Sequence, residues 1–381
     1  MTAHRSLIIL SLVFLNTCGP KQIPPESPLD SAANHYQRGL ASLAAGDART
    51  AQAEFERARV LDPDYPGAYA GDALVAMVRG DFWRARKEIE KSLHKDSDFI
   101  DAHIAKGRVV TEEGWVRRYP VKEWLQEALA SYRKARQKAP DNPAIYYHQG
   151  HTYLRALDLE AARESFTRVL ELNRGPLVAP AMAEVEKIQM IERGSPGSQM
   201  GVKIGLVPQL TRAELAVLVL EELKLPDLMR RRPSSIREPA FRAPQEAGEA
   251  TPVPTDLAGS WARTWIEDVL GLGIPGLEAF PDGTFRPDQP VTRANYALAN
   301  QGVLILLTGD GSLSTRYVGE ASRFPDVRGD FYAYNAIALN AERGIMSADK
   351  VSGRFRPEAP VSGAEALLII RELQNAFRME F

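Results

Sequence analysis

The sequence predicts a mainly α-helical protein, with a solenoid of helical hairpins in the N-terminal half and a bundle of short helical modules in the C-terminal half. Three observations predict this. Small and apolar residues recur every 34 residues in the first half. A set of motifs in the second half returns about 70 residues later. Segments such as AQAEFERARVL place apolar residues on one face of a helix and charges on the other.

Length and composition exclude several classes of protein. A chain of 381 residues is too long for one ordinary core, so two or more domains are expected. The net charge of -2 gives no general attraction to nucleic acid, and none is expected as a partner. Cys18 is the one cysteine, which excludes an internal disulfide and a zinc-thiolate site.

The first 17 residues are expected to be a signal peptide. A basic start precedes an apolar run from Leu7 to Leu15 that is too short to span a bilayer. Cys18 directly follows Leu15-Asn16-Thr17, and this segment resembles a bacterial lipoprotein signal, although Thr17 replaces the usual smaller residue. The resemblance implies lipidation at Cys18; the alternative is an ordinary signal peptide with a chance cysteine.

Residues 18–31 contain several prolines and are expected to form a flexible tether. Gly19 follows the cysteine where some lipoproteins carry aspartate. By resemblance to Gram-negative lipoproteins, this implies a cell-envelope protein held by lipid at the periplasmic face of the outer membrane.

Residues 32–193 are predicted to form the solenoid. The pair Gly46-Asp47 returns as Gly80-Asp81, and a third copy carries about nine extra residues around GWVRRYPVKEW. Small residues allow two helices to approach closely, and a larger side chain fills the space to the next hairpin. The larger residue of each copy is one of Phe55, Ile89, Tyr132 and Phe166.

This spacing resembles the tetratricopeptide repeat, over about residues 32–176, and residues 177–193 are predicted to be a capping helix. The resemblance implies an inner surface that holds a peptide or another protein. The sequence does not identify that partner.

Two modules are predicted at residues 254–311 and 312–381. Each has an opening turn, a first helix, a Gly-Ile turn, an extended loop ending in Phe-Arg-Pro, and a second helix capped by Thr292 or Ser362. The alignment pairs Asp256 with Asp326 and Trp261 with Phe331.

An incomplete module is predicted at residues 194–224, where Leu210-Thr211-Arg212-Ala213 begins a helix whose preceding partner helix is not recognisable. Residues 225–253 are predicted to be a Pro/Arg-rich linker. Its triplet Arg230 to Arg232 is interpreted as solvated charge.

The module motifs resemble the S-layer homology domain. That resemblance implies a bundle of modules with grooves between them that bind cell-wall glycan or peptidoglycan. It also implies which residues bind the glycan. They are Arg293, Arg212, Thr292, Trp261 and Asp256.

The arginine of the second-helix motif is present at Arg212 and Arg293 but is replaced by Gly363 in the last module. A guanidinium at a helix start suits a carboxylate or phosphate, so at most two competent grooves are predicted. The alternative is that these arginines pair with carboxylates between modules. Trp261 has two interpretations as well: stacking on a sugar, or anchoring the module core.

No catalytic motif, cofactor site or metal site is predicted. His148 and His151 could share a helix face, but no third ligand lies at a supporting spacing. The favoured hypothesis is a non-enzymatic envelope adaptor that binds a protein through its repeats and wall polymer through its modules. The alternatives are an assembly or pilotin-like factor for a secretion or pilus complex, and a wall-active enzyme.

Overall fold

The computed structural model describes residue 27, residues 29–230 and residues 253–380. These fall into two compact units that divide between Val178 and Ala179. The predicted signal peptide and Cys18 lie outside the described residues, as do residues 231–252 of the predicted linker. Residues that precede them in the linker form a short helix, α12 (Leu225–Arg230), with Leu225 fully buried.

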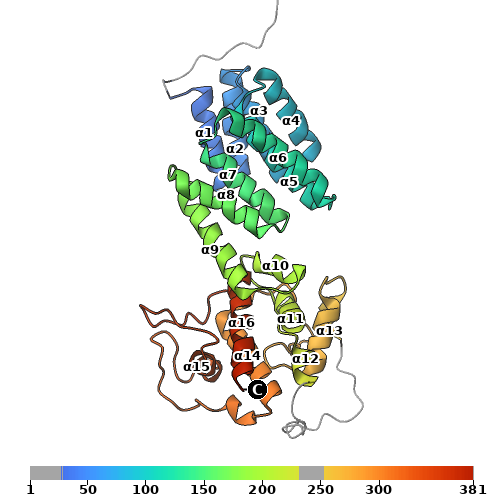
Figure 1. The fold of residues 1–381 in the computed structure, drawn as a ribbon, viewed down its shortest axis with the longest axis vertical. Helices are drawn as coiled ribbons and strands as arrows, with labels where there is room; N and C mark the ends of the chain where they lie inside the picture. Colours follow the sequence, from blue (N-terminus) through green and yellow to red (C-terminus); the bar gives the residue numbers. More distant parts are fainter. Residues whose placement is uncertain (1–26, 28, 231–252, 381) are drawn as a thin grey trace, which may run out of the picture. The chain divides into compact units, whose positions relative to one another are not determined.

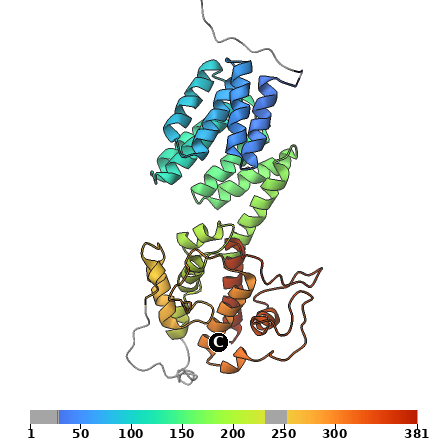
Figure 2. The same cartoon turned by 180° about the vertical axis from the view of Figure 1, so that it is seen from behind.

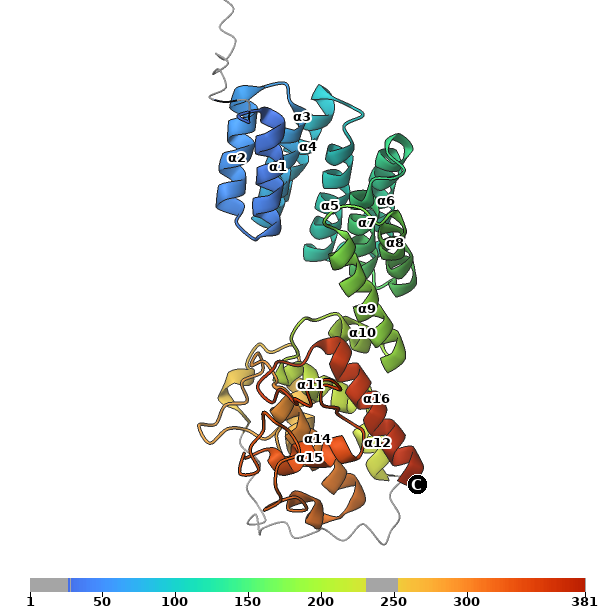
Figure 3. The same ribbon diagram turned by 90° about the vertical axis from the view of Figure 1, so that its left-hand side faces the viewer.

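The first unit is built from four antiparallel helical hairpins that stack in chain order (Figures 1 and 2). Figure 3 shows the first and last hairpins at opposite ends of the stack. The helices are α1 (Ala32–Ala44), α2 (Ala48–Leu61), α3 (Pro66–Val78), α4 (Phe82–Lys95), α5 (Ile100–Val116), α6 (Val121–Lys138), α7 (Pro143–Arg155) and α8 (Leu159–Leu172).

The repeated Gly-Asp pair turns the chain between the two helices of a hairpin. Gly46 and Gly80 have φ values of 83° and 77°, a left-handed conformation that glycine adopts without steric cost. The aspartate that follows caps the next helix, since Asp47 and Asp81 each accept a backbone N–H three residues later. The predicted period is therefore confirmed as a hairpin turn with its cap.

Aromatic side chains join neighbouring hairpins where glycine leaves room. A Cβ atom added to Gly39 would lie only 2.4 Å from the ring of Phe55, and one added to Gly71 only 2.3 Å from it. Phe55 therefore packs against the backbone of helices from two successive repeats, which buries it completely. The first unit is a helical solenoid, as the sequence predicts.

The second unit contains helices from all three predicted modules (Figure 1). The helices are α9 (Val178–Gly194), α10 (Gln199–Gly205), α11 (Arg212–Glu221), α12, α13 (Arg263–Leu272), α14 (Arg293–Thr308), α15 (Tyr334–Glu342) and α16 (Gly363–Glu380), with 3-10 turns at Thr255–Leu257 and Gly311–Ser314. Helix α10 occupies the place of the first helix that the sequence left unrecognised.

Helix α9 was predicted to cap the repeats, but the structure places the unit boundary at its start. Its last turn packs inside the second unit. A Cβ atom on Gly194 would lie 2.8 Å from the Cβ of Leu367, and Ile191 contacts Gly205 of α10. This burial explains why α9 is assigned to the second unit.

The three modules are joined by a closed ring of backbone hydrogen bonds. Leu210 donates its N–H to Val361, Val361 donates to Val291, and Val291 donates to Leu210, at 2.7, 3.0 and 2.8 Å. All three side chains are buried, and each immediately precedes the capping residue of a second helix. The incomplete module therefore completes a three-module bundle with approximate threefold symmetry.

Candidate functional site

Arg212, the first residue of α11, reaches into the extended loop of the next module. Its Nε, Nη1 and Nη2 atoms donate to the carbonyl oxygens of Phe285, Gly276 and Glu278 at 2.9, 3.0 and 2.8 Å. The guanidinium also lies 4.6 Å from the ring centre of Phe285. Burial lowers the pKa of Arg212. Its three hydrogen bonds show that the planar guanidinium holds the loop of the next module.

Arg293 repeats this arrangement one module further along the chain. Its Nε and Nη2 atoms donate to the carbonyl oxygens of Phe355 and Ser347, both at 2.8 Å, and its Nη1 atom pairs with Glu365. The ring of Phe355 lies 4.6 Å from the guanidinium. We call the contacts made by Arg212 and Arg293 the arginine seams.

The third module contact has glycine in the same position, and we call it the glycine seam. The N–H of Gly363 donates to Val207, as the N–H groups of Arg212 and Arg293 donate to their neighbouring modules. A Cβ atom on Gly363 would lie 1.7 Å from the carbonyl oxygen of Ile204. The backbones approach so closely that no side chain fits.

The glycine seam lacks the loop that an arginine would hold. In the two complete modules, residues 274–291 and 345–361 separate the Gly-Ile turn from the second helix, and both segments contain Phe-Arg-Pro. In the first module only residues 206–210 fill this interval. The arginine is therefore present where the facing module has a long loop and absent where it does not.

Asp256 and Thr292 also hold local structure. The carboxylate of Asp256 accepts the N–H groups of Phe285 and Arg286 at 2.9 and 2.7 Å, and Asp326 does the same for the second loop. These bonds support Arg286, which has a left-handed φ of 57°. Thr292 caps α14 by accepting the N–H of Asn295 at 3.2 Å.

Trp261 lies on the surface and not in the module core. It is 51% exposed and packs at a tilt against Trp265, with ring centres 6.0 Å apart. Its predicted counterpart was Phe331, but the structure shifts the pairing by one residue. Ala262 and Ala333 are both buried and occupy the N-cap position of the first helix in their modules. The residues directly before them, Trp261 and Tyr332, therefore correspond, and Tyr332 is 64% exposed.

Comparison with known families assigns the two complete modules. The model of the S-layer homology domain matches residues 255–297 and 323–367. The C-terminal half contains S-layer homology domains. The segment around Arg212 lies outside both matches, although the hydrogen-bond ring places it with them. No curated protein matches the chain.

Solved structures similar to this chain include tetratricopeptide-repeat proteins. A thermophilic protein of this kind from Thermus thermophilus is 17% identical, with a TM-score of 0.37, covering 52% of this chain and 96% of that chain. PilF of Pseudomonas aeruginosa is 21% identical, with a TM-score of 0.33 and coverages of 51% and 85%. YrrB, described as having an unusual peptide-binding site, is 17% identical, with a TM-score of 0.20 and coverages of 41% and 94%. At these scores the similarity identifies no partner.

Arg108, on α5, is a candidate binding residue that the sequence did not single out. Its charge interacts with Tyr132, Tyr36, Glu112 and Tyr147, and burial lowers its pKa. Glu112 is already bonded to Arg155, at 3.2 Å. Within the described residues Arg108 has no hydrogen-bond acceptor, so its guanidinium could donate to an incoming carboxylate. Arg108 lies outside the repeat motif, and no sequence signal distinguishes it from other helix arginines.

The histidines near Arg108 do not form a recognisable metal site. Burial, then Arg108 and His151, hold the pKa of His148 well below its usual range. The ring of His151 packs edge-on against Tyr147 and Phe166, with ring centres 4.7 and 5.1 Å apart. In the described part of the chain, no group of three or more metal-ligating side chains comes together.

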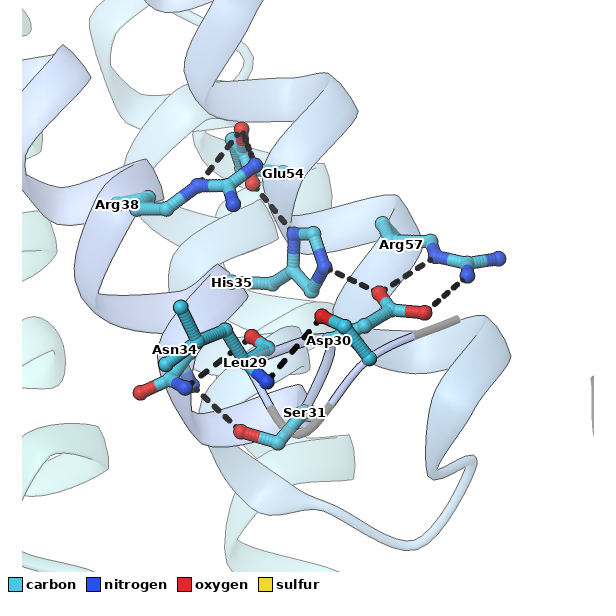
Figure 4. Close-up of polar contacts among 9 residues, drawn as sticks. Leu29, Asp30, Ser31, Asn34, His35, Arg38, Glu54 and Arg57 are labelled. Carbon is cyan, nitrogen blue, oxygen red and sulfur yellow. Dashed lines mark hydrogen bonds and ion pairs between the residues drawn. The ribbon is translucent and has the colours of Figure 1, made fainter. Parts of the chain in front are cut away.

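A charged network fastens the start of the repeat stack. Figure 4 shows His35 between two carboxylates, with its ring nitrogens 2.5 Å from Glu54 and 2.7 Å from Asp30. Arg38 pairs with Glu54, and Arg57 pairs with Asp30. These contacts tie the residues before α1 to α2 and give the terminal repeat a polar outer end, as solenoids require.

The structure describes one arginine of the triplet in the predicted linker. Arg230, from the predicted arginine triplet, pairs with Asp227 on α12, while the other two arginines lie outside the described residues.

Among the helices that the structure describes, none has both the length and the apolar character needed to cross a bilayer.

Proposed function

We propose that this protein is a non-enzymatic adaptor of the cell envelope that binds wall polymer through its C-terminal unit and a protein through its N-terminal unit. One observation carries this proposal: two segments match the S-layer homology domain, a family of wall-binding modules. The exposed aromatic side chains of both modules and the helical solenoid support it.

The proposed wall-polymer surface includes Trp261 and the loops beside it. Exposed Trp261 and Tyr332 occupy equivalent positions and can stack on sugar rings, because their faces are apolar and partly free of protein contacts. Three of the predicted glycan-binding residues shape this surface by holding the extended loops: Arg212, Arg293 and Asp256. Thr292 holds the start of α14. The donors and acceptors of these four residues are largely bonded within the protein, which favours an indirect contribution to binding.

The proposed protein partner binds the inner helices of the solenoid. Arg108, on α5, interacts electrostatically with Tyr36 of α1 and Tyr147 of α7. An acidic side chain or a terminal carboxylate of a peptide would be favoured beside its guanidinium. Attachment to the outer membrane by lipid at Cys18 completes the proposal. Labelled palmitate incorporated in cells by the wild type, and not by Cys18→Ser, is the result that supports it.

Pelleting with purified sacculi tests wall binding. The wild type is expected in the pellet, and Trp261→Ala with Tyr332→Ala is expected to bind at least roughly fivefold more weakly, as loss of an aromatic contact residue does. Arg212→Ala with Arg293→Ala should also reduce pelleting, through the loops. Wild-type protein that stays in the supernatant contradicts the wall-binding proposal, and unchanged pelleting of the arginine pair removes those residues from it.

A further inference from the structure

The third hairpin differs from the others at its tip. Helices α5 and α6 contain 17 and 18 residues, whereas the other six helices of the solenoid contain 13 or 14. About four extra residues extend a helix by roughly 6 Å, or one turn. The predicted insertion therefore forms a longer hairpin and not a loose loop.

The extended tip, residues 115–122, has an ordered backbone. The N–H of Tyr119 donates to Gly114 at 2.9 Å, and Arg118 turns the chain with a φ of 56°. Beneath the tip, Trp124 is buried, and a Cβ atom on Gly114 would lie 2.3 Å from it. The tip is thus fixed on a packed base.

Apolar side chains on this tip face solvent. Val116 is 60% exposed, Tyr119 and Val121 are each 46% exposed, and Trp115 is 40% exposed. The adjacent second hairpin adds exposed Val78 and Trp83. Isolated exposed apolar residues are ordinary, but several in one short segment mark an interaction surface.

The tip carries cations without an acidic residue among them, whereas each of the other three turns contains an aspartate. The other three turns end in a capping aspartate, at Asp47, Asp81 and Asp158, whereas Pro120 stands at this position in the third hairpin without a side-chain cap. From Trp115 through Lys122 there are three cations, Lys122 included, and no acidic residue. Arg117 pairs with Glu113, but within the described residues Arg118 and Lys122 form no ion pair.

We propose that the tip of the α5–α6 hairpin contacts the surface of an anionic lipid bilayer. Tryptophan and tyrosine favour the interface between headgroups and acyl chains, where their rings are apolar and their polar atoms remain hydrated. Arginine and lysine beside them attract anionic headgroups. The tip is the end of a hairpin that is longer than the others, so it suits a soft planar surface better than an extended peptide, which needs a groove. The near-neutral charge of the whole chain does not oppose this local attraction.

A fluorophore at the tip tests this inference in the full chain. Cys18→Ser removes the native thiol, and Val116→Cys then places an environment-sensitive label at the tip. Val351→Cys provides the matched control, because Val351 is 98% exposed and lies in the other unit. The label at position 116 is expected to brighten and shift to the blue with phosphatidylglycerol vesicles, but not with phosphatidylcholine vesicles. The label at position 351 should not respond, even if the apolar N-terminal segment also binds lipid.

Charge-neutral variants separate lipid contact from nonspecific adsorption. Arg118→Gln with Lys122→Gln should lower the affinity for anionic vesicles, measured by titrating the response at position 116, roughly twenty-five-fold, about fivefold for each cation lost. An unchanged emission spectrum at position 116 with anionic vesicles contradicts the inference, as does an equal response from the glutamine variant. A response to lipid-free envelope protein but not to vesicles would assign the tip to a protein partner instead.

Discussion

The arginine seams and the glycine seam solve the same packing problem in different ways. At each seam, the first residue of a second helix donates its N–H to the neighbouring module. Where that module has a long Phe-Arg-Pro loop, a guanidinium fills the space and bonds to the loop carbonyls. Where the loop is missing, the backbones touch and glycine is required. The residue at this position therefore depends on whether the module that it faces has a long loop.

The largest effect is expected from adding a side chain at the glycine seam. Gly363→Ala should lower the free energy of unfolding of the second unit by more than about 3 kcal/mol, because the new Cβ overlaps a backbone oxygen. Chemical denaturation measures this. Gly271→Ala is the matched control, since nothing lies within 4 Å of its Cβ position, and it should change stability by less than about 1 kcal/mol. Equal effects of the two variants would contradict the claim that the glycine seam has no room for a side chain.

Removing the buried arginine should have the next largest effect. Arg212→Ala leaves three carbonyl oxygens without donors, so a loss of about 3 kcal/mol in the free energy of unfolding is expected. Arg212→Lys should recover only part of this loss, because an ammonium group cannot reproduce the planar fork. Full recovery by lysine would show that charge alone holds this seam.

Arg293→Ala should cost less, about 2 kcal/mol, because this side chain makes two carbonyl bonds and one ion pair. This ion pair is partly hydrated, with side-chain exposures of 13% for Arg293 and 28% for Glu365, which weakens its contribution. A double-mutant cycle with Glu365→Gln measures the coupling. A loss larger than that of Arg212→Ala would reverse the predicted order of the seams.

The smallest effect on stability is expected at the exposed aromatic position. Trp261→Ala should change the free energy of unfolding by less than about 1 kcal/mol, since half of the side chain already faces solvent. Thermal unfolding checks this. A large loss would return Trp261 to the role of a core anchor and would complicate its use in the wall-binding assay.

The sequence predicted the repeated elements better than the contacts between them. The 34-residue period, the Gly-Asp turns and the caps depend on neighbours in the chain, so their positions could be predicted. Arg212 bonds to a residue 73 positions away, and no local pattern reveals that distance in space. The correspondence of Trp261 with Tyr332 was missed because the residue before Tyr332, Phe331, is also aromatic. The proposed role of Arg108 depends on residues from several repeats, which the sequence does not place together.

Hydrogen exchange of the two extended loops tests most directly whether each arginine holds the loop of the module it faces. In Arg212→Ala, amides at residues 276–287 should exchange faster while those at 347–357 remain protected, and Arg293→Ala should give the reverse pattern. Protection of both loops in both variants, or exposure of the same loop by both, would contradict the account.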